Sequence, residues 1–582
     1  MDEKPKSIWK KTLGRKWLGS LMMAVAGSTS IVLVSTLTWG DPAVGLSAEM
    51  AYWIVLVLVL WPLITFIRWL CCWRNLKRTL FGLACFATLI ALFYAEENWR
   101  GHRAWTNYRH DWEAKGEKFD FKDFIPPPVP DEKNFAMTPV VNSCYSYILT
   151  RDGKQITKEQ RDTNLVSRLR FDFGDNKWNT NATGYWVKGT TSNLKLWQGR
   201  YRELATKTNL FAVPPQPQSP AADVLLALGK YDATVEELRL AAQLPECRFP
   251  LNYDSENPAM IFLPHLAALK ASSRLLQLRA IAELQNGQSE KALADVLLAL
   301  RLSAFMRSEP TLISHLVRIA MMDIIMQPIY EGLAEHRWTD AQLVALDAEL
   351  VKLDFLADFN FTLRCERAFS SAIIDYVSAK NRLQRYRELF ETRWDDEGNH
   401  QNSHLGAQAV GVYLMPQGWF DQNKLVIAQL HESWLLRGAE PEKYLVQPRL
   451  VSQSPLAGVA PGPFNFFAME LIPSLTNSCK RFAREQISVD LARTAIALER
   501  FRLAHGEFPE SLDALAPTLV AQVPHDVIGG QPLKYRRTSD GQFVLYSVGW
   551  NEKDDGGVTV IPAGSSQPKF EQGDWVWRYP EK

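Results

Sequence analysis

The chain has 582 residues, long enough for roughly three or four domains of ordinary size. Its 65 Lys and Arg residues balance 64 Asp and Glu residues, so no net charge attracts it to nucleic acid, which we exclude as a partner. The apolar fraction of 47% is ample for a hydrophobic core.

Three apolar segments predict a membrane anchor in residues 1–95. Residues 17–39, 50–67 and 80–95 contain no charged side chain. At ~1.5 Å per helical residue, each segment comes close to spanning the ~30 Å hydrocarbon core of a bilayer. We therefore expect three transmembrane helices, with the lipid bilayer as a partner.

The basic residues predict the orientation of this anchor. Six Lys and Arg residues precede the first segment and four follow the second, whereas the loop at 40–49 has none. By the positive-inside rule the N-terminus and the second loop are cytoplasmic, which places everything after residue 95 outside the cytoplasm. Arg100, Arg103 and Arg109 oppose this assignment, because they lie on the outer side.

The next two segments differ from the anchor and from each other. Residues 96–135 predict an interfacial helix rich in aromatic side chains, followed by a stalk that is extended through the prolines at 126–130. Residues 136–215 alternate apolar and polar positions and contain Asp-Gly and Gly-Asp pairs. That pattern predicts a small β-rich segment.

In residues 216–395, apolar residues recur at the spacing that predicts an α-helical bundle. Small and apolar residues recur three or four apart on both sides of Asn286-Gly287, which predicts a helical hairpin at 275–302. The hairpin resembles part of a tetratricopeptide repeat, but no second copy follows at a period of ~34 residues, so an ordinary bundle is favoured. Residues 396–479 are rich in proline and predict an irregular segment with short helices.

The four cysteines after the anchor do not have the spacing of a zinc site. Cys144, Cys247, Cys365 and Cys479 are about a hundred residues apart and form no CxxC or Cys/His pattern. In an oxidising compartment they allow two disulfides, and buried free thiols are the alternative.

Residues 480–582 contain an ordered set of turn motifs. A helix that ends at His505-Gly506 is followed by Phe508-Pro509, Val523-Pro524-His525-Asp526, a hairpin around Asp540-Gly541, Ser547-Val548-Gly549 and an acidic loop at 551–557. This order resembles the globular head of the major pseudopilins of type II secretion systems, which implies an α+β domain. The helix is charged and lacks the apolar assembly segment of those proteins, so fibre formation is not implied.

The resemblance also implies a calcium site, because the last acidic loop of such heads resembles one. At the matching positions, Asn551, Asp554 and Asp555 supply the hard oxygen ligands that calcium prefers. The alternative is a solvated turn in which these residues serve only the backbone geometry.

As a whole, the chain resembles a family of uncharacterised bacterial membrane-anchored proteins. The segment Ala104-Trp105-Thr106-Asn107-Tyr108, the prolines at 126–130 and Leu263-Pro264-His265 carry this resemblance. It implies the bacterial cytoplasmic (inner) membrane as the location, and it implies no activity.

Catalytic motifs are missing from the sequence. It contains no phosphate-binding loop, no Gly-x-Ser-x-Gly and no His-Glu-x-x-His. His265 is a candidate base and Glu366 a candidate acid, but a single His at a helix start and a Glu beside Arg364 and Arg367 are more typical of packing and ion pairs. His431-Glu432 is expected on the solvated surface.

We therefore expect a membrane-anchored, mainly α protein with three transmembrane helices, a helical bundle with a small β-rich insert, and a C-terminal α+β pseudopilin-like domain. The predicted role is non-enzymatic interaction or scaffolding in the cell envelope, beside a secretion or pilus-like system and with envelope proteins as partners. The alternative is an envelope hydrolase, or another enzyme, with its site in the helical domain near His265 and Glu366.

Overall fold

The computed structural model describes residues 73–145, 147–149, 155–157, 169, 171, 182–208, 210–390, 406–562 and 568–580. The first two expected membrane segments, 17–39 and 50–67, lie outside these described residues. Contacts divide the chain into two compact units, Met1–Glu96 and Glu97–Lys582. The boundary falls within a single long helix.

Helix α3 (Trp73–Glu113) contains the third expected membrane segment. Its apolar window of 18 residues has a mean hydropathy of 1.7, and none of that window is buried. Large apolar side chains such as Phe81 and Phe86 are 72% and 62% exposed. By length and composition this helix is able to cross a membrane.

One other helix among the described residues passes the same test of length and composition. Helix α11 (Leu312–Ala334) has a mean hydropathy of 1.4, but 67% of its apolar window is buried. That burial is typical of a helix in a protein core.

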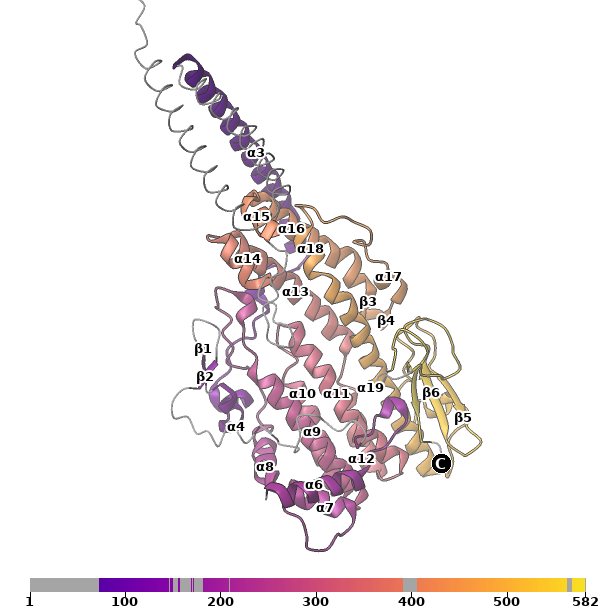
Figure 1. The fold of residues 1–582 in the computed structure, drawn as a ribbon. Coiled ribbons are helices and arrows are strands. Elements are labelled where there is room, and N and C mark those ends of the chain that lie inside the picture. The colour runs from indigo at the N-terminus through magenta and orange to yellow at the C-terminus, as the bar shows by residue number, and fades with distance from the viewer. Residues whose placement is uncertain are drawn as a thin grey trace, which may run out of the picture. The chain divides into compact units, whose positions relative to one another are not determined.

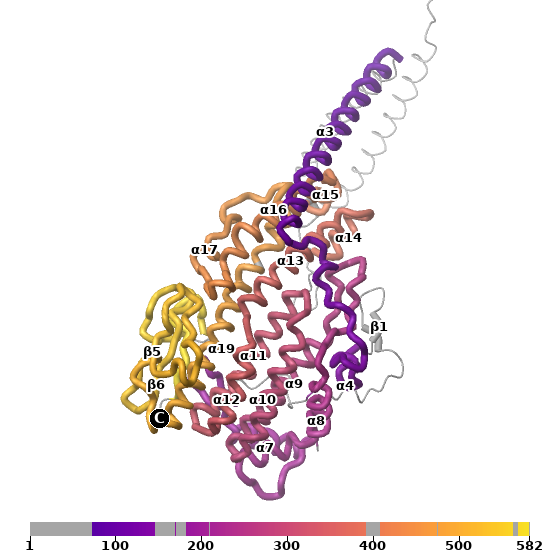
Figure 2. Tube along the Cα trace, turned by 180° about the vertical axis from the view of Figure 1, so that it is seen from behind, coloured from indigo at the N-terminus to yellow at the C-terminus, as the bar shows by residue number. Residues whose placement is uncertain are grey.

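The unit that begins at Glu97 is mainly helical. Its longer helices are α9 (Pro264–Gln285), α10 (Ser289–Ala304), α11, α12 (Asp340–Leu350), α13 (Phe355–Ser378), α16 (Gln417–Leu430) and α19 (Pro473–His505). The shorter ones are α4 (Pro139–Asn142), α6 (Leu194–Thr208), α7 (Pro220–Leu228), α8 (Asp232–Ala241), α14 (Arg382–Phe390), α15 (Gly406–Leu414), α17 (Pro448–Ser452) and α18 (Phe466–Leu471). Figures 1 and 2 place α14, α15 and α16 at one end of this body and α7 at the opposite end.

Helices α9 and α10 form an antiparallel hairpin that covers the range 275–302. Helix α9 ends at Gln285, Asn286 follows as its C-cap, and Gly287 has a φ of +74°. Glycine adopts this left-handed conformation without steric cost, so the chain reverses within a few residues. Helix α11 then packs against both members of the hairpin.

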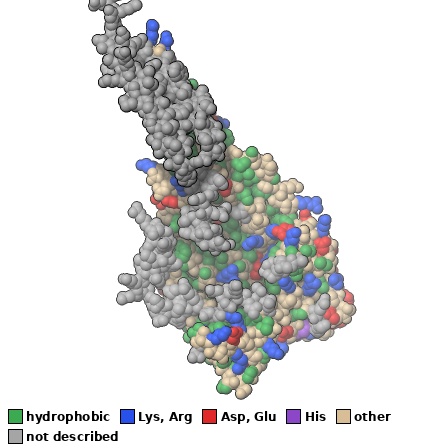
Figure 3. All heavy atoms as spheres, in the orientation of Figure 1, with side chains coloured by type: hydrophobic (Ala, Val, Ile, Leu, Met, Phe, Trp, Pro, Cys, Tyr) green, Lys and Arg blue, Asp and Glu red, His purple; other side chains and the backbone are tan. Residues whose placement is uncertain are grey.

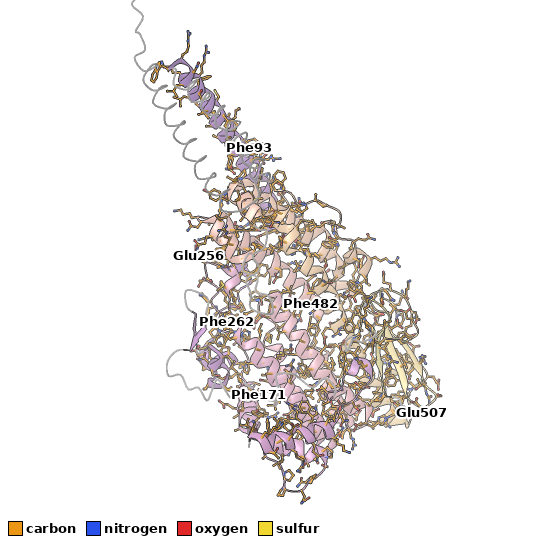
Figure 4. The ribbon with its side chains drawn as sticks, viewed as in Figure 1. Phe93, Phe171, Glu256, Phe262, Phe482 and Glu507 are labelled. Atoms are coloured by element: carbon orange, nitrogen blue, oxygen red, sulfur yellow. The ribbon has the colours of Figure 1, made fainter. Side chains whose placement is uncertain are left out.

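Helix α19 is the central helix of the body. It contacts α11, α12 and α13, and nearly every residue from Phe482 to Leu498 is buried. The ring of Phe482 lies among these helices, 5.2 Å from the ring of Phe359 between centroids (Figure 4). The helix begins at Pro473, earlier than the pseudopilin resemblance implies, and ends at His505 before Gly506.

A three-stranded antiparallel sheet packs on the C-terminal half of α19. Its strands are β5 (Lys534–Arg537), β6 (Phe543–Ser547) and β7 (Trp575–Arg578), in the order β5-β6-β7. Two small antiparallel pairs lie elsewhere, β1 (Tyr147–Leu149) with β2 (Gln155–Thr157) and β3 (Ala439–Glu440) with β4 (Leu445–Val446). Trp577 of β7 reaches the core, where its ring lies 5.5 Å from that of Tyr330 in α11. The visible face of the molecule mixes charged and hydrophobic side chains (Figure 3).

Two segments contain more helix than the sequence predicts. Residues 194–208, expected in the β-rich segment, form helix α6, because Leu194, Trp197 and Tyr201 recur at helical spacing and bury one face. The segment 396–479, expected to be irregular, contains α15 to α18 and the first turns of α19 where the structure describes it. Pro416, Pro448 and Pro473 flank or open helices there, a position in which proline is well tolerated.

The part of α3 from Glu97 onward packs against α16 through two glycines. A Cβ on Gly101 would overlap the carbonyl of Gly418, and a Cβ on Gly418 would overlap the carbonyl of Glu97. The side chain of Asn98 accepts the N–H of Gly418 at 2.9 Å, and the indole of Trp419 donates to Glu97 at 2.7 Å. The two helices therefore meet backbone to backbone.

We expect Gly418→Ala to lower the free energy of unfolding by about 1–3 kcal/mol, because the new methyl group meets rigid backbone. The matched control is Gly199→Ala in the middle of α6, where nothing lies within 4 Å of the added Cβ. That substitution should be neutral or stabilise by up to about 1 kcal/mol. Unfolding of the full chain in detergent measures the free energy of unfolding of both variants. Equal stability of Gly418→Ala and Gly199→Ala would contradict the close contact between Gly101 and Gly418.

Candidate functional site at the start of helix α11

His265, the candidate base, is fully buried at the second position of α9. Its Nε2 lies 2.7 Å from Oε1 of Glu309, which is in the turn between α10 and α11. The imidazole ring stacks on Phe249, with centroids 3.9 Å apart, and its centroid lies 5.9 Å from that of Tyr145. The ring is thus held at its edge by a carboxylate and on its face by aromatic rings.

Glu309 also binds the first turn of α11. Ser314 Oγ donates to Oε2 of Glu309 at 2.5 Å, while Thr311 caps the helix by accepting the N–H of Ser314. His315 Nε2 donates to the carbonyl oxygen of Glu309 at 3.1 Å. Burial, aided by Arg318, lowers the pKa of His315 to about 4, so this imidazole is neutral near pH 7.

Glu366, the candidate acid, reaches the same turn from α13. Its Oε1 accepts the N–H of Leu312, the first residue of α11, at 2.8 Å. The first N–H groups of a helix have no partner within the helix, so Glu366 satisfies one of them from a neighbouring helix. Burial raises the pKa of Glu366 to about 7. The structure therefore brings His265 and Glu366 to the two ends of residues 309–312, where each binds a different residue.

The hydrogen-bonded order Ser314–Glu309–His265 does not activate the Ser314 hydroxyl as a nucleophile. In a serine hydrolase the imidazole lies between the hydroxyl and the carboxylate and removes the hydroxyl proton. Here Glu309 lies between Ser314 and His265, and the hydroxyl donates its proton to the carboxylate. These three residues are at most 2% exposed, so the network as described stabilises the starts of α9 and α11.

Arg364 and Arg367 form the ion pairs that their position in α13 predicts. Arg367 is fully buried; its Nη2 lies 2.7 Å from Oε2 of Glu117, and its Nη1 pairs with Glu432. Arg364 lies 3.1 Å from the same Glu117 carboxylate. The guanidinium of Arg367 also stacks 4.2 Å from the ring centroid of Phe119. The cluster fastens the segment after α3 to α13.

The expectation that His431 is solvated was wrong. His431 is fully buried at the start of a π-helical turn, His431–Leu435, and its Nδ1 donates to the carbonyl of Ile427 at 2.8 Å. Burial lowers the pKa of His431 to about 4. The neighbouring Glu432 turns toward Arg367, a partner 65 residues earlier that no local pattern reveals.

The three candidate calcium ligands are hydrogen-bonded within their own loop and to strand β6. Asn551 Nδ2 donates to Asp555 at 2.8 Å, while Oδ1 of Asp554 accepts the N–H of Gly556 at 3.1 Å and the hydroxyl of Tyr546 at 3.0 Å. These bonds are typical of an Asp/Gly turn. No group of three or more His, Cys, Asp or Glu side chains able to hold a metal occurs in the part of the chain that the structure describes.

The four cysteines beyond the anchor are free thiols. Burial raises the pKa of the Cys247 and Cys365 thiols, and it raises the pKa of Cys479 to about 12. Thiols of this kind react slowly, because the thiolate is the reactive form.

Searches against protein-family models, curated proteins and solved structures find no match to this chain. The sequence indicates His265 and Glu366 as candidates, but it does not indicate residues 309–312, which both of them bind. The one local signal for this segment was the spacing of Thr311 and Ser314, which fits a helix cap. Glu309 carries no signal of its own, since its two partners come from different helices.

We expect Glu366→Gln to change how stability depends on pH. The raised pKa means that the folded chain binds the Glu366 proton more tightly than the unfolded chain, whose carboxyl titrates near 4.5. The wild type therefore loses stability as the pH rises from 4.5 through about 7, whereas glutamine keeps the acceptor for Leu312 and does not titrate.

The unfolding free energy of the variant relative to wild type should rise by about 2–3 kcal/mol between about pH 4.5 and pH 8. Chemical denaturation at a series of pH values measures this difference. Glu132→Gln removes an equally negative but exposed side chain and is the control for charge alone. If the unfolding free energies of Glu366→Gln and wild type changed with pH in the same way, the raised pKa of Glu366 would be contradicted.

Proposed function

We propose that this chain is a bacterial inner-membrane protein that displays a helical interaction body outside the cytoplasm. The observation that carries the proposal is the apolar part of α3, whose 18-residue window has a mean hydropathy of 1.7 and no buried fraction. Burying such a surface in lipid is favourable by about 25 cal/mol per Å² relative to water. An exposed apolar surface of this kind is typical of a membrane or protein interaction site.

The apolar segments at 17–39 and 50–67 support two further spans before α3. The excess of Lys and Arg before the first and after the second supports a cytoplasmic N-terminus. With three spans, the residues from Glu97 onward are extracytoplasmic. This topology gives the chain an anchor and a large outward-facing body.

Interaction, rather than catalysis, is the role that the body supports best. The candidate base His265 is fully buried against Glu309, and the hydroxyl of Ser314 donates its proton to that carboxylate. The resemblance of residues 480–582 to pseudopilin heads supports partners in a secretion or pilus-like envelope system. Helix α19 is enclosed by α11, α12 and α13, so assembly through that helix is disfavoured.

For the anchor, we expect the full chain to stay with membranes washed in alkaline carbonate, because apolar helices in lipid resist such extraction. Alkaline phosphatase, which is active only outside the cytoplasm, should be active when fused after Lys582. The same reporter fused after Lys77, which precedes the apolar part of α3, should be inactive. Release of the chain by carbonate would overturn the anchor, and the reverse reporter pattern would overturn the orientation.

For the partner, we expect a photo-crosslinking amino acid at position 558 to capture an envelope protein in native membranes. Val558 is 52% exposed and follows the acidic loop of the C-terminal segment. Val344, an apolar residue 44% exposed on α12, is the matched control position. Mass spectrometry should identify a secretion or pilus-like component from position 558 only. The same products from both positions, or none, would count against the proposed partner.

A further inference from the structure

Four large side chains at one end of the body are exposed despite being aromatic or apolar. Trp99 is 61% exposed, Tyr413 60%, Leu414 57% and Phe464 38%. They come from α3, from the end of α15 and from the segment just before α18. We call these four residues the interfacial collar.

Contacts among the described residues bring the three segments together. Trp99 lies two residues before Gly101, which meets Gly418 backbone to backbone, and Leu414 lies four residues before Gly418. Four residues of chain span at most ~14 Å, so the end of α15 stays close to the helix crossing. Figures 1 and 2 agree in placing α15 beside the start of α16.

Phe464 is held at the same crossing from the other side. Its ring packs edge-on against Trp419, the residue after Gly418, with centroids 5.4 Å apart. The guanidinium of Arg100 lies 5.6 Å from the centre of the same ring. Asn423 fixes the preceding residue by donating to the carbonyl of Pro463 at 2.7 Å.

The position of the collar along the chain indicates what covers it. Trp99 follows Ala95, the end of the apolar segment, by four residues, a rise of about 6 Å in a helix. The polar layer on each side of a bilayer's hydrocarbon core is about 5–8 Å thick. With the apolar segment in a bilayer, Trp99 therefore lies at the depth of the lipid headgroups.

The chemistry of the collar fits that layer. Trp and Tyr are enriched at membrane interfaces because they combine an apolar ring with a polar group. Arg103 is exposed and stacks 5.3 Å from the ring of Trp99, so a cation lies beside the aromatic surface. Cations near the surface are attracted to the phosphate groups of anionic lipids.

We propose that the interfacial collar docks the body onto the outer headgroup layer of the membrane that holds its anchor. The inference rests on the proposed membrane location and adds a second, peripheral attachment to it. The body then lies on the lipid surface through α15 and the segment before α18, in the manner of an interfacial helix.

The test uses the full chain in lipid nanodiscs that contain anionic phosphatidylglycerol. An environment-sensitive fluorescent amino acid replaces Tyr413, and in a second variant Leu414, so that native cysteines stay untouched. Lipids with a nitroxide near the headgroup quench side chains in the interface, and lipids with a nitroxide deep in the acyl chain quench side chains in the hydrocarbon core, where Phe86 is expected. The control positions are Phe86, 62% exposed in the apolar part of α3, and Leu226, 45% exposed on α7 at the opposite end of the body.

We expect nitroxide lipids to reduce fluorescence about twofold at 413 and 414, as for a side chain in the interface, and to leave 226 unchanged. If fluorescence is quenched at position 86 but not at positions 413 and 414, the proposed docking of the collar is wrong, whereas the membrane anchor is still supported. No quenching at 86 overturns the proposed membrane location itself. If position 413 is protected from quenching by aqueous iodide but is not quenched by nitroxide lipids, a protein and not lipid covers the collar. This result also overturns the proposed membrane docking.

Discussion

The backbone contact between Gly101 and Gly418 sets how the end of α3 lies on the rest of the body. With no side chain between the two helices, Asn98 accepts the N–H of Gly418 in the first turn of α16, and Glu97 accepts the indole N–H of Trp419. Helix α16 then places Lys424 within 2.8 Å of Asp375 on α13. The proposed collar depends on the same contact, because it brings Trp99 of α3 close to the end of α15 and to the segment before α18.

Buried charges give the remaining helix contacts their specificity. Arg367 joins Glu117 and Glu432, and in α19 the buried Arg484 lies 2.6 Å from Asp323 of α11. Removing charges from water is costly, so such pairs add little net stability, but loss of one partner leaves the other charge buried and unpaired. A helix that shifts by one turn would break these pairs, which favours a single packing arrangement.

Features that depend on residues close together in the chain could be predicted from the sequence. Contacts between residues far apart in the chain could not. The period around Asn286-Gly287 indicates the α9–α10 hairpin, and His505-Gly506 marks the end of α19. By contrast, Arg367 and Glu117 are 250 residues apart, and nothing near Gly101 indicates Gly418. His431 was expected in solvent because the core that buries it is assembled only by the fold, although its hydrogen-bond partner Ile427 is four residues away. Residues 194–208 were expected within the β-rich segment 136–215, yet burial of Trp197 and Tyr201 on one face favours helix α6.

The late position of strand β7 in the chain affects the order in which the parts of the body fold. Its Arg578 carbonyl accepts the hydroxyl of Tyr330 at 3.0 Å across a separation of 248 residues, and Trp577 packs on both Tyr330 and Trp186. Helix α11 therefore leaves the ribosome long before the strand that completes its surroundings. Contacts at such separation are slow to form, since a long loop must close first. Until then the apolar face around Tyr330 is open to solvent and to chaperones, and maturation of the body is complete only when β7 has docked.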